Sequence, residues 1–521
     1  MWSRTQRCSA LAVLASSVAV SLALAACSSQ GSSSSGTSQT STTLKVGYYG
    51  DPSGGIDPDV FYDVEGDSLM LAMYDTLLTY RPGSTILAPN LATAWQVSPD
   101  GLTYTFTLRQ GVKFHDGTPF NAAAVVKNFQ RRIAVKQAVS YMVDGISTVE
   151  APSVYVFVAH LKQRNNAFLE YMASMYGPKM VSPLALSQHA GSDNALKWMS
   201  THEDGTGPYT LTAYQPGSEY GLSRFERYWG PRPYFSKVVI SVIPDVSTAE
   251  LQLRSGGLDL LTHGIANSEL QSLQAAGLQV NQFPAAIRQV VLLNQSKPPF
   301  DNQQVRQAAA AAILAASTSA VPAVFGTYSK PARSAYPQIM STNGEFAPLP
   351  QLPTAKVPAG TKIVFSFTSS EPALLQLAQF FKRALDKAGF AVTLKGDTVS
   401  QEFGYAASPG AAPNATLSTF NPDAAHPDTW ARPVWYTGGG LNLFQSSDKV
   451  LDGLLDAGAK AATPALQQQL YGEAGARASA DAYIIPVDDA NDSVVSRADL
   501  IGLTHVPVYI WMVNFATLAR R

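Results

Sequence analysis

Cysteine is almost absent from this chain of 521 residues, and charge is scarce. Its two cysteines, Cys8 and Cys27, both stand near the start, so the long remainder of the chain contains none that could form a disulfide. Charged residues make up 14% of the sequence and the formal net charge is −1, whereas an average soluble protein carries roughly 25% charged residues. Nucleic-acid binding needs a basic surface that neutralises phosphates. The composition therefore argues against a nucleic-acid partner.

Motifs for catalysis and for metal binding are also missing. The seven histidines are scattered without a His-x-x-x-His spacing, which argues against a preformed zinc site. No Gly-x-Ser-x-Gly and no phosphate-binding glycine loop occurs. The triplet His115-Asp116-Gly117 has catalytic residue types, but its setting between a strand and a helix indicates a structural turn. We therefore expect neither an enzyme nor a resident cofactor or metal ion.

What the chain does have at its start is a targeting segment. Arg4 and Arg7 precede an apolar run over residues 9–24, which is too short for a convincing membrane span. The run ends in Leu24-Ala25-Ala26-Cys27, the pattern of a lipoprotein signal that is cleaved before a lipid-modified cysteine. We expect a signal peptide over residues 1–26 and an extracytoplasmic protein anchored to the bacterial cell membrane through Cys27. The alternative is an ordinary signal peptide in which Cys27 is incidental.

Residues 27–43 form a Ser/Thr-rich stretch with no apolar side chain after Cys27 to bury, and we expect a flexible tether. The globular part begins at residue 44. Alternating or β-branched runs predict strands over 44–49, 103–109, 154–161 and 237–243, and helical spacing predicts helices over 67–80, 121–133 and 305–316. The pattern over residues 363–394 predicts a strand, a helix and a second strand, a unit that builds parallel sheets. A proline-rich loop is expected over 331–360. Together these patterns indicate two α/β blocks.

Several sequence blocks together resemble one protein family. The main block comprises Leu91-Ala-Thr-Ala-Trp95 and the segment from Asp100 to Phe120. Supporting blocks follow in order at 205–209, 228–230, 292–294 and 299–301. The chain resembles the extracellular solute-binding proteins of oligopeptide, dipeptide and nickel ABC transporters over nearly all of residues 44–521. It departs from the family pattern where Ile313 is followed by Leu314 instead of an acidic residue, and in the proline-rich loop.

The resemblance implies a fold. It is the bilobal α/β fold of periplasmic-binding proteins, class II type, with an extra subdomain inserted in lobe I and a hinge that closes the lobes on a ligand. The implied boundaries are lobe I at 44–285 with the inserted subdomain at about 84–205, lobe II at 286–485, and a C-terminal return to lobe I at 486–521. The chain would cross between the lobes near 283–290 and 485–487.

The resemblance also implies ligand-binding residues. In peptide-binding members a lobe II carboxylate receives the α-ammonium group of the peptide, in a local pattern that Asp423, Pro427 and Trp430 reproduce here. A carboxylate in a closed cleft can accept such charge-assisted hydrogen bonds. The alternative for Asp423 is a turn residue, because Asn-Pro-Asp sequences favour turns. Aromatic side chains that either line ligand pockets or pack the lobes are Tyr48, Tyr49, Trp430, Trp435 and Tyr436.

Three functions from different classes fit these observations. The favoured one is a membrane-tethered, monomeric receptor that captures short peptides in the interlobe cleft and delivers them to the transmembrane subunits of an ABC permease. The second keeps the fold and binds a nickel chelate, haem or a sugar derivative. The third is a lipoprotein that regulates or scaffolds the cell envelope without transport. The small molecules that co-purify with the protein would separate the three.

Overall fold

The computed structural model describes residues 42–521 apart from positions 53, 264, 266, 342–343 and 354. The predicted signal peptide, the predicted lipid-anchor residue Cys27 and almost all of the predicted tether lie outside the described residues.

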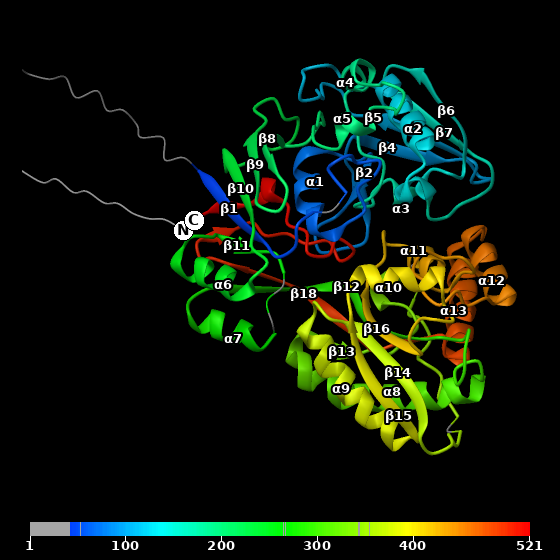
Figure 1. The fold of residues 1–521 in the computed structure, drawn as a ribbon. Helices are drawn as coiled ribbons and strands as arrows, with labels where there is room; N and C mark the ends of the chain where they lie inside the picture. Colours follow the sequence, from blue (N-terminus) through cyan, green and yellow to red (C-terminus); the bar gives the residue numbers. More distant parts are fainter. Residues whose placement is uncertain (1–41, 53, 264, 266, 342–343, 354) are drawn as a thin grey trace, which may run out of the picture. The chain divides into compact units, whose positions relative to one another are not determined.

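A long mixed sheet runs through the described residues and organises the fold (Figure 1). Most neighbouring strands are antiparallel, whereas β1 is parallel to β10 and β11, and β14 is parallel to β15 and β16. The strand order is β15 (Phe390–Asp397), β14 (Thr361–Thr368), β16 (Ala415–Phe420), β12 (Gln279–Leu293), β18 (Asp488–Ser496), β11 (Leu260–Leu261), β1 (Thr43–Tyr48), β10 (Lys237–Val242), β9 (Glu219–Arg224) and β8 (Tyr209–Gln215), with β13 (Ser329–Pro331) on β18 and β17 (Ile484–Pro486) on β12.

Strand β12 changes partners along its length. Its first part pairs antiparallel with β18 as far as Ile287, which lies opposite Ala490, after a register shift between Pro284 and Ile287. From Arg288 to Leu293 it pairs with β16, and near its end also with β17. The fold is therefore bilobal. We call the sheet from β18 to β8, with the elements packed on it, lobe I, and the sheet formed by β12, β14, β15, β16 and β17 lobe II.

Lobe I also carries smaller sheets. One has the order β4 (Ala92–Val97), β5 (Thr103–Leu108), β7 (Val156–Leu161) and β6 (Ile146–Ser153), and two pairs join β2 (Leu78–Tyr80) to β3 (Leu87–Pro89) and β19 (Leu500–Ile501) to β20 (Ala519–Arg520). Polar and apolar residues alternate in β5, and the apolar ones, such as Phe106, are buried. The predicted strand there is confirmed.

The helices surround these sheets. Those of lobe I are α1 (Asp67–Met73), α2 (Ala122–Val135), α3 (Phe168–Tyr171), α4 (Pro183–Gln188), α5 (Leu196–Met199), α6 (Val246–Ser255) and α7 (Asn267–Ala275). Those of lobe II are α8 (Gln303–Phe325), α9 (Pro372–Lys387), α10 (Val399–Phe403), α11 (Pro427–Trp435), α12 (Lys449–Ala459) and α13 (Pro464–Asp481). Asn121 begins α2 as predicted, since its side chain accepts a hydrogen bond from the Ala124 N–H at 3.0 Å.

Lobe II contains the predicted strand–helix–strand unit. β14, α9 and β15 follow each other, and the two strands are parallel, which confirms the prediction. α9 buries one apolar face, with Leu374, Leu377 and Phe381 fully enclosed. α8 is long and apolar enough to cross a membrane. It lies beside α9 instead, and Ala309 and Ile313 belong to the lobe II core.

The helix predicted over 67–80 is wrong in its second half. α1 ends at Met73, Tyr74 is extended, and the chain continues into β2. The carbonyl of Met73 accepts a hydrogen bond from the Gly207 N–H at 3.0 Å, and the Leu78 N–H donates to the Met172 carbonyl at 3.0 Å. Hydrogen bonds to distant segments thus outweigh the local helical spacing.

Candidate functional site

Asp423 lies where the two lobes meet. It follows β16 of lobe II, and its side chain is buried. Two tyrosine hydroxyls of lobe I donate to its Oδ2 atom, Tyr62 at 2.9 Å and Tyr141 in a short contact. Ser174, also of lobe I, donates its hydroxyl to the Asp423 carbonyl at 2.5 Å. The aspartate therefore accepts hydrogen bonds from one lobe while its backbone belongs to the other.

Burial controls the charge of this carboxylate. Removal from water raises the pKa of Asp423 to about 6, and the hydrogen bonds from Tyr141 and Tyr62 reduce that rise. Burial raises the pKa of the Tyr62 and Tyr141 hydroxyls, and the negative charge of Asp423 raises it further. Near neutral pH the site therefore presents a buried negative charge to anything that enters between the lobes.

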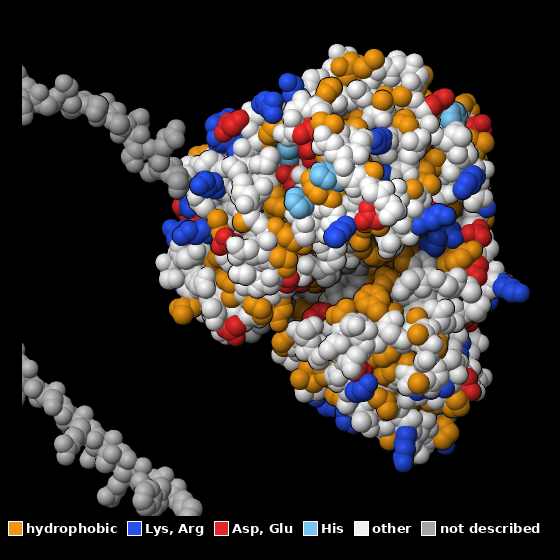
Figure 2. All heavy atoms as spheres, turned by 45° about the horizontal axis from the view of Figure 1, so that its top comes forward, with side chains coloured by type: hydrophobic (Ala, Val, Ile, Leu, Met, Phe, Trp, Pro, Cys, Tyr) orange, Lys and Arg blue, Asp and Glu red, His pale blue; other side chains and the backbone are white. Residues whose placement is uncertain are grey.

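Tyrosine rings surround the carboxylate on the lobe I side. Tyr62 packs edge-on against Tyr176 with ring centroids 4.7 Å apart, and Tyr141 packs against Tyr171 at 5.6 Å. The Tyr62 side chain is nevertheless 44% exposed, so it also faces solvent. Figure 2 shows the molecular surface hollowed between its upper and lower parts. Aromatic faces beside a carboxylate form a setting that favours a cation.

A second tyrosine contact joins the lobes beside the first. The Ala425 N–H of lobe II donates to the hydroxyl of Tyr80 at 3.0 Å, and that hydroxyl donates to Glu170 Oε2 at 2.6 Å. Burial raises the pKa of Glu170 to about 8. The backbone two residues after Asp423 is thus held by lobe I as well.

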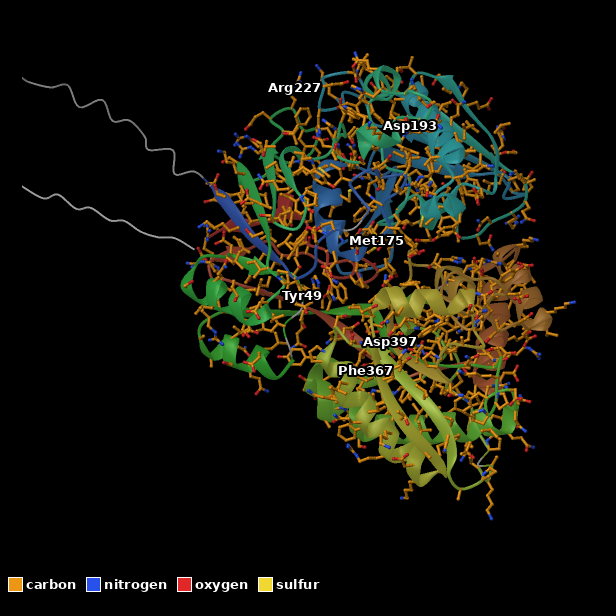
Figure 3. All side chains as sticks on the ribbon, in the orientation of Figure 1. Tyr49, Met175, Asp193, Arg227, Phe367 and Asp397 are labelled. Carbon is orange, nitrogen blue, oxygen red and sulfur yellow. The ribbon has the colours of Figure 1, made fainter. Side chains whose placement is uncertain are left out.

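The predicted aromatic residues of lobe I occupy different settings. Tyr48 is buried in the lobe I core, and its hydroxyl has no hydrogen-bond partner among the described residues. Tyr49 is half-buried at the end of β1 and lies edge-on to His263, with centroids 6.2 Å apart. In Figure 3 Tyr49 lies on the side of lobe I nearest lobe II. Of the two, Tyr49 has the position that a ligand could reach.

The predicted aromatic residues of lobe II pack within that lobe. Trp430 and Trp435 are buried in its core, where Trp435 lies edge-on to Tyr336 at 4.8 Å. Tyr436 lies under the guanidinium of Arg432 at 4.6 Å. Among the described residues, none of these three side chains forms a hydrogen bond with Asp423. Their contact with a ligand stays a prediction.

Further acidic groups lie at the carboxyl ends of the parallel lobe II strands. Glu371 accepts a hydrogen bond from Thr419 at 2.8 Å, and Glu402 accepts one from Ser418 at 2.7 Å. Burial raises the pKa of Glu402 to about 7. In Figure 3 Asp397 lies at the end of these strands that is nearer lobe I. Within the described residues, no cluster of histidine and acidic side chains could hold a metal ion.

Sequence reasoning missed the lobe I half of the site. Tyr62, Tyr141 and Ser174 stand far from Asp423 in the chain, as Tyr80 does from Ala425, and only the fold brings these residues together. The arrangement as a whole can bind a positively charged group at the junction of two lobes.

Residues 87–442 match the family described as bacterial extracellular solute-binding proteins, family 5. Among curated relatives, the probable D,D-dipeptide-binding periplasmic protein DdpA of Escherichia coli is 29% identical over 270 residues, which cover 51% of this chain and 52% of the relative. Heme-binding protein A of Haemophilus influenzae is 29% identical over 325 residues, covering 56% and 57%. The chain thus spans about half the length of the curated relatives that it matches.

Solved structures share the fold over a greater length. The periplasmic binding protein DppA of Helicobacter pylori, solved in complex with the peptide STSA, superposes with a TM-score of 0.77 at 23% identity. The match covers 92% of this chain and 98% of that one. At this identity the likeness supports the bilobal fold.

Proposed function

From the premise that the chain belongs to the family 5 bacterial extracellular solute-binding proteins, we propose that it captures short peptides between its lobes by their free α-amine and delivers them to the transmembrane subunits of an ABC importer. The proposed domains are lobe I at 44–285, lobe II at 286–485 and a C-terminal return at 486–521, with an inserted subdomain at about 84–205. The proposed receptor acts as a monomer outside the cytoplasm.

The observation that carries this proposal is the buried carboxylate of Asp423 between the lobes. Both tyrosine hydroxyls reach the same oxygen, Oδ2, and no hydrogen bond from another described residue reaches Oδ1. A peptide ammonium that donates to Oδ1 would therefore add to the tyrosine contacts. Hydrogen bonds between an ammonium and a carboxylate are roughly twice as strong as neutral ones. Several relatives bind peptides according to their names, which supports the same class of ligand.

Native mass spectrometry of the purified chain tests this function. We expect the protein to carry co-purified short peptides, and after their removal to bind the tetrapeptide Ser-Thr-Ser-Ala more tightly than its N-acetylated form. A co-purified haem or metal chelate, together with equal affinity for both forms of the tetrapeptide, would replace the peptide function by capture of a non-peptide solute. Absence of any bound small molecule and of tetrapeptide binding would favour an envelope role without transport.

Peptide affinity should depend on pH through Asp423. Its pKa in the free protein is about 6, so the carboxyl group is protonated at lower pH and cannot pair with an ammonium. The peptide amine, with a pKa of about 8, stays charged between pH 5 and 7. Affinity for Ser-Thr-Ser-Ala should therefore rise about tenfold from pH 5 to pH 7 in calorimetric titrations. The N-acetylated peptide should show no such rise, and a flat profile for the free peptide would contradict the assignment.

Cys27 is the proposed membrane anchor. It stands directly after a leucine and two alanines at the end of an apolar run, the position at which a lipoprotein signal is cleaved. Cys27→Ser should release the protein from the membrane fraction or leave it unprocessed, as detergent partitioning and intact mass would show. Cys8→Ser removes the other cysteine and should leave anchoring unchanged. A Cys27→Ser protein that is still matured and partitions with detergent would disprove the anchor.

A further inference from the structure

Asn166 of lobe I forms a second connection to lobe II, apart from the Asp423 site. It lies between β7 and α3, and it reaches the end of α12, which lies below α3 in Figure 1. Its backbone N–H donates to the carbonyl of Ala459 at 2.8 Å. Its side-chain Nδ2 donates to the carbonyls of Ala461 at 2.9 Å and Gly458 at 3.3 Å. One residue thus donates to three backbone carbonyls of the other lobe.

Two of the accepting carbonyls, those of Gly458 and Ala459, lie at the end of α12, and the third, that of Ala461, lies two residues beyond it. Ala459 is the last residue of α12, and the final carbonyls of an α-helix have no N–H partner within the helix. Within one lobe such groups are satisfied by a cap or by water. The Gly458 carbonyl also accepts a hydrogen bond from the Ala461 N–H at 3.2 Å within lobe II. Among the described residues, Asn166 of the opposite lobe is the hydrogen-bond donor to the Ala459 and Ala461 carbonyls, and it can donate only while the lobes are together.

We propose that Asn166 is a positioning residue for lobe closure, which caps α12 across the interface and stabilises the closed arrangement whether or not a ligand is present. This goes beyond the proposed capture of peptides, because the hydrogen bonds of Asn166 to described residues reach Gly458, Ala459 and Ala461 and none of the residues assigned to ligand binding. Opening the lobes returns the Ala459 and Ala461 carbonyls, together with the backbone and side-chain N–H groups of Asn166, to water. The contact therefore contributes to the equilibrium between open and closed forms and not to ligand chemistry.

Hydrogen exchange at the backbone N–H of Asn166 measures this contact directly. The amide is protected only while it donates to Ala459, so its protection factor reports how much of the ligand-free protein is closed. Mass spectrometry with fragmentation that resolves single residues, on the ligand-free full chain, provides the readout. We expect measurable protection in the wild type. Because no ligand is added, failure of this proposal and failure of the peptide function give separate results.

Variants at position 166 distinguish a cap from ordinary packing. Asn166→Ala removes the two side-chain donors and should lower the protection of amide 166 roughly three- to thirtyfold. Asn166→Asp keeps the size but places a carboxylate at the negative end of the helix, so it should lower protection further. A packing role predicts instead that the aspartate variant behaves like the wild type.

Asn165→Ala is the matched control. The Asn165 side chain accepts a hydrogen bond from the Ala167 N–H at 3.0 Å, within the same loop of lobe I. Its backbone carbonyl, which the substitution retains, accepts from Tyr104 at 3.2 Å. After correction for intrinsic exchange, this variant should keep the wild-type protection of amide 166. Absence of protection in the wild type, or equal protection in the variants at 165 and 166, would overturn the proposal.

Discussion

Replacing Asp423 by asparagine is expected to weaken binding of the tetrapeptide Ser-Thr-Ser-Ala by roughly thirtyfold to several thousandfold. Breaking one partner of a buried charge pair costs about 2–5 kcal/mol, largely because the other charge is left desolvated and unpaired. The asparagine retains a side-chain oxygen that can accept from Tyr62 and Tyr141, so the lobe contacts at this position are conserved. Isothermal titration calorimetry at pH 7 measures the change.

The peptide amine provides the second half of this test. N-acetylation of the tetrapeptide should weaken binding to the wild type by a similar factor, and it should have little further effect on the Asp423→Asn protein, because both changes delete one interaction. Additive losses would place the amine at another carboxylate. Asp428 is the nearest alternative in sequence, but Arg432 already pairs with it at 2.8 Å.

Asp386→Asn is the control within the same lobe. Asp386 pairs with Lys382 on α9 at 2.7 Å, and its side chain is 39% exposed. We expect this variant to bind the free and the acetylated tetrapeptide as the wild type does. Loss of amine selectivity in the Asp386→Asn protein would show that net charge, and not the Asp423 position, governs binding.

Replacing Arg132 by methionine is expected to lower the free energy of unfolding by about 3–5 kcal/mol. Arg132 is fully buried on α2. Its guanidinium donates to Asp59 at 2.8 Å, to the Tyr176 carbonyl at 2.8 Å and to the Pro58 carbonyl at 2.6 Å. Methionine fills much of the volume but leaves a buried carboxylate with one fewer partner and two carbonyls without donors.

Urea unfolding followed by circular dichroism provides the measurement for Arg132→Met, with the midpoint and the slope both determined. Arg227→Met is the control, since Arg227 is exposed and its guanidinium lies 5.6 Å from the Phe225 ring. The control should change the free energy of unfolding by no more than about 1 kcal/mol. Equal unfolding midpoints for the two variants would show that the buried arginine contributes no more than a surface one.

Local patterns predicted local structure well in this chain. The helix predicted from residue 121 begins there as α2, because the Asn121 side chain accepts a hydrogen bond from the Ala124 N–H only three positions along the chain. The strand–helix–strand unit at 363–394 was also predictable from the sequence, because its two strands and its helix each show the hydrophobic pattern of their own type of element. The helix expected over 67–80 failed after Met73, where a hydrogen bond from Gly207 ends it. The spacing of apolar residues within 67–80 carries no information about that contact.

The candidate site was only half predictable for the same reason. Asp423 stands in a local pattern with Pro427 and Trp430 that the family resemblance implies, so it could be singled out from the sequence. Its partners Tyr62 and Tyr141 lie in the other lobe, and nothing in their neighbouring residues signals a contact so distant in the chain. Trp430 and Trp435 follow Asp423 closely, yet the turn of α11 directs them into the lobe II core. Sequence proximity to a site does not determine which side of a helix faces it.

The partner change in β12 has a consequence for how the chain could be divided. Ile287 and Ala490 lie directly opposite each other in an antiparallel pair. The chain therefore leaves lobe I after Ile287 and returns to it along β18 beside the same residue, as it would around an inserted gene segment, and β13 of the intervening segment also pairs with the start of β18. Antiparallel neighbours can be joined by a two-residue turn. A deletion that replaces 288–489 with such a turn would convert β12 and β18 into a simple hairpin and leave lobe I as one uninterrupted polypeptide.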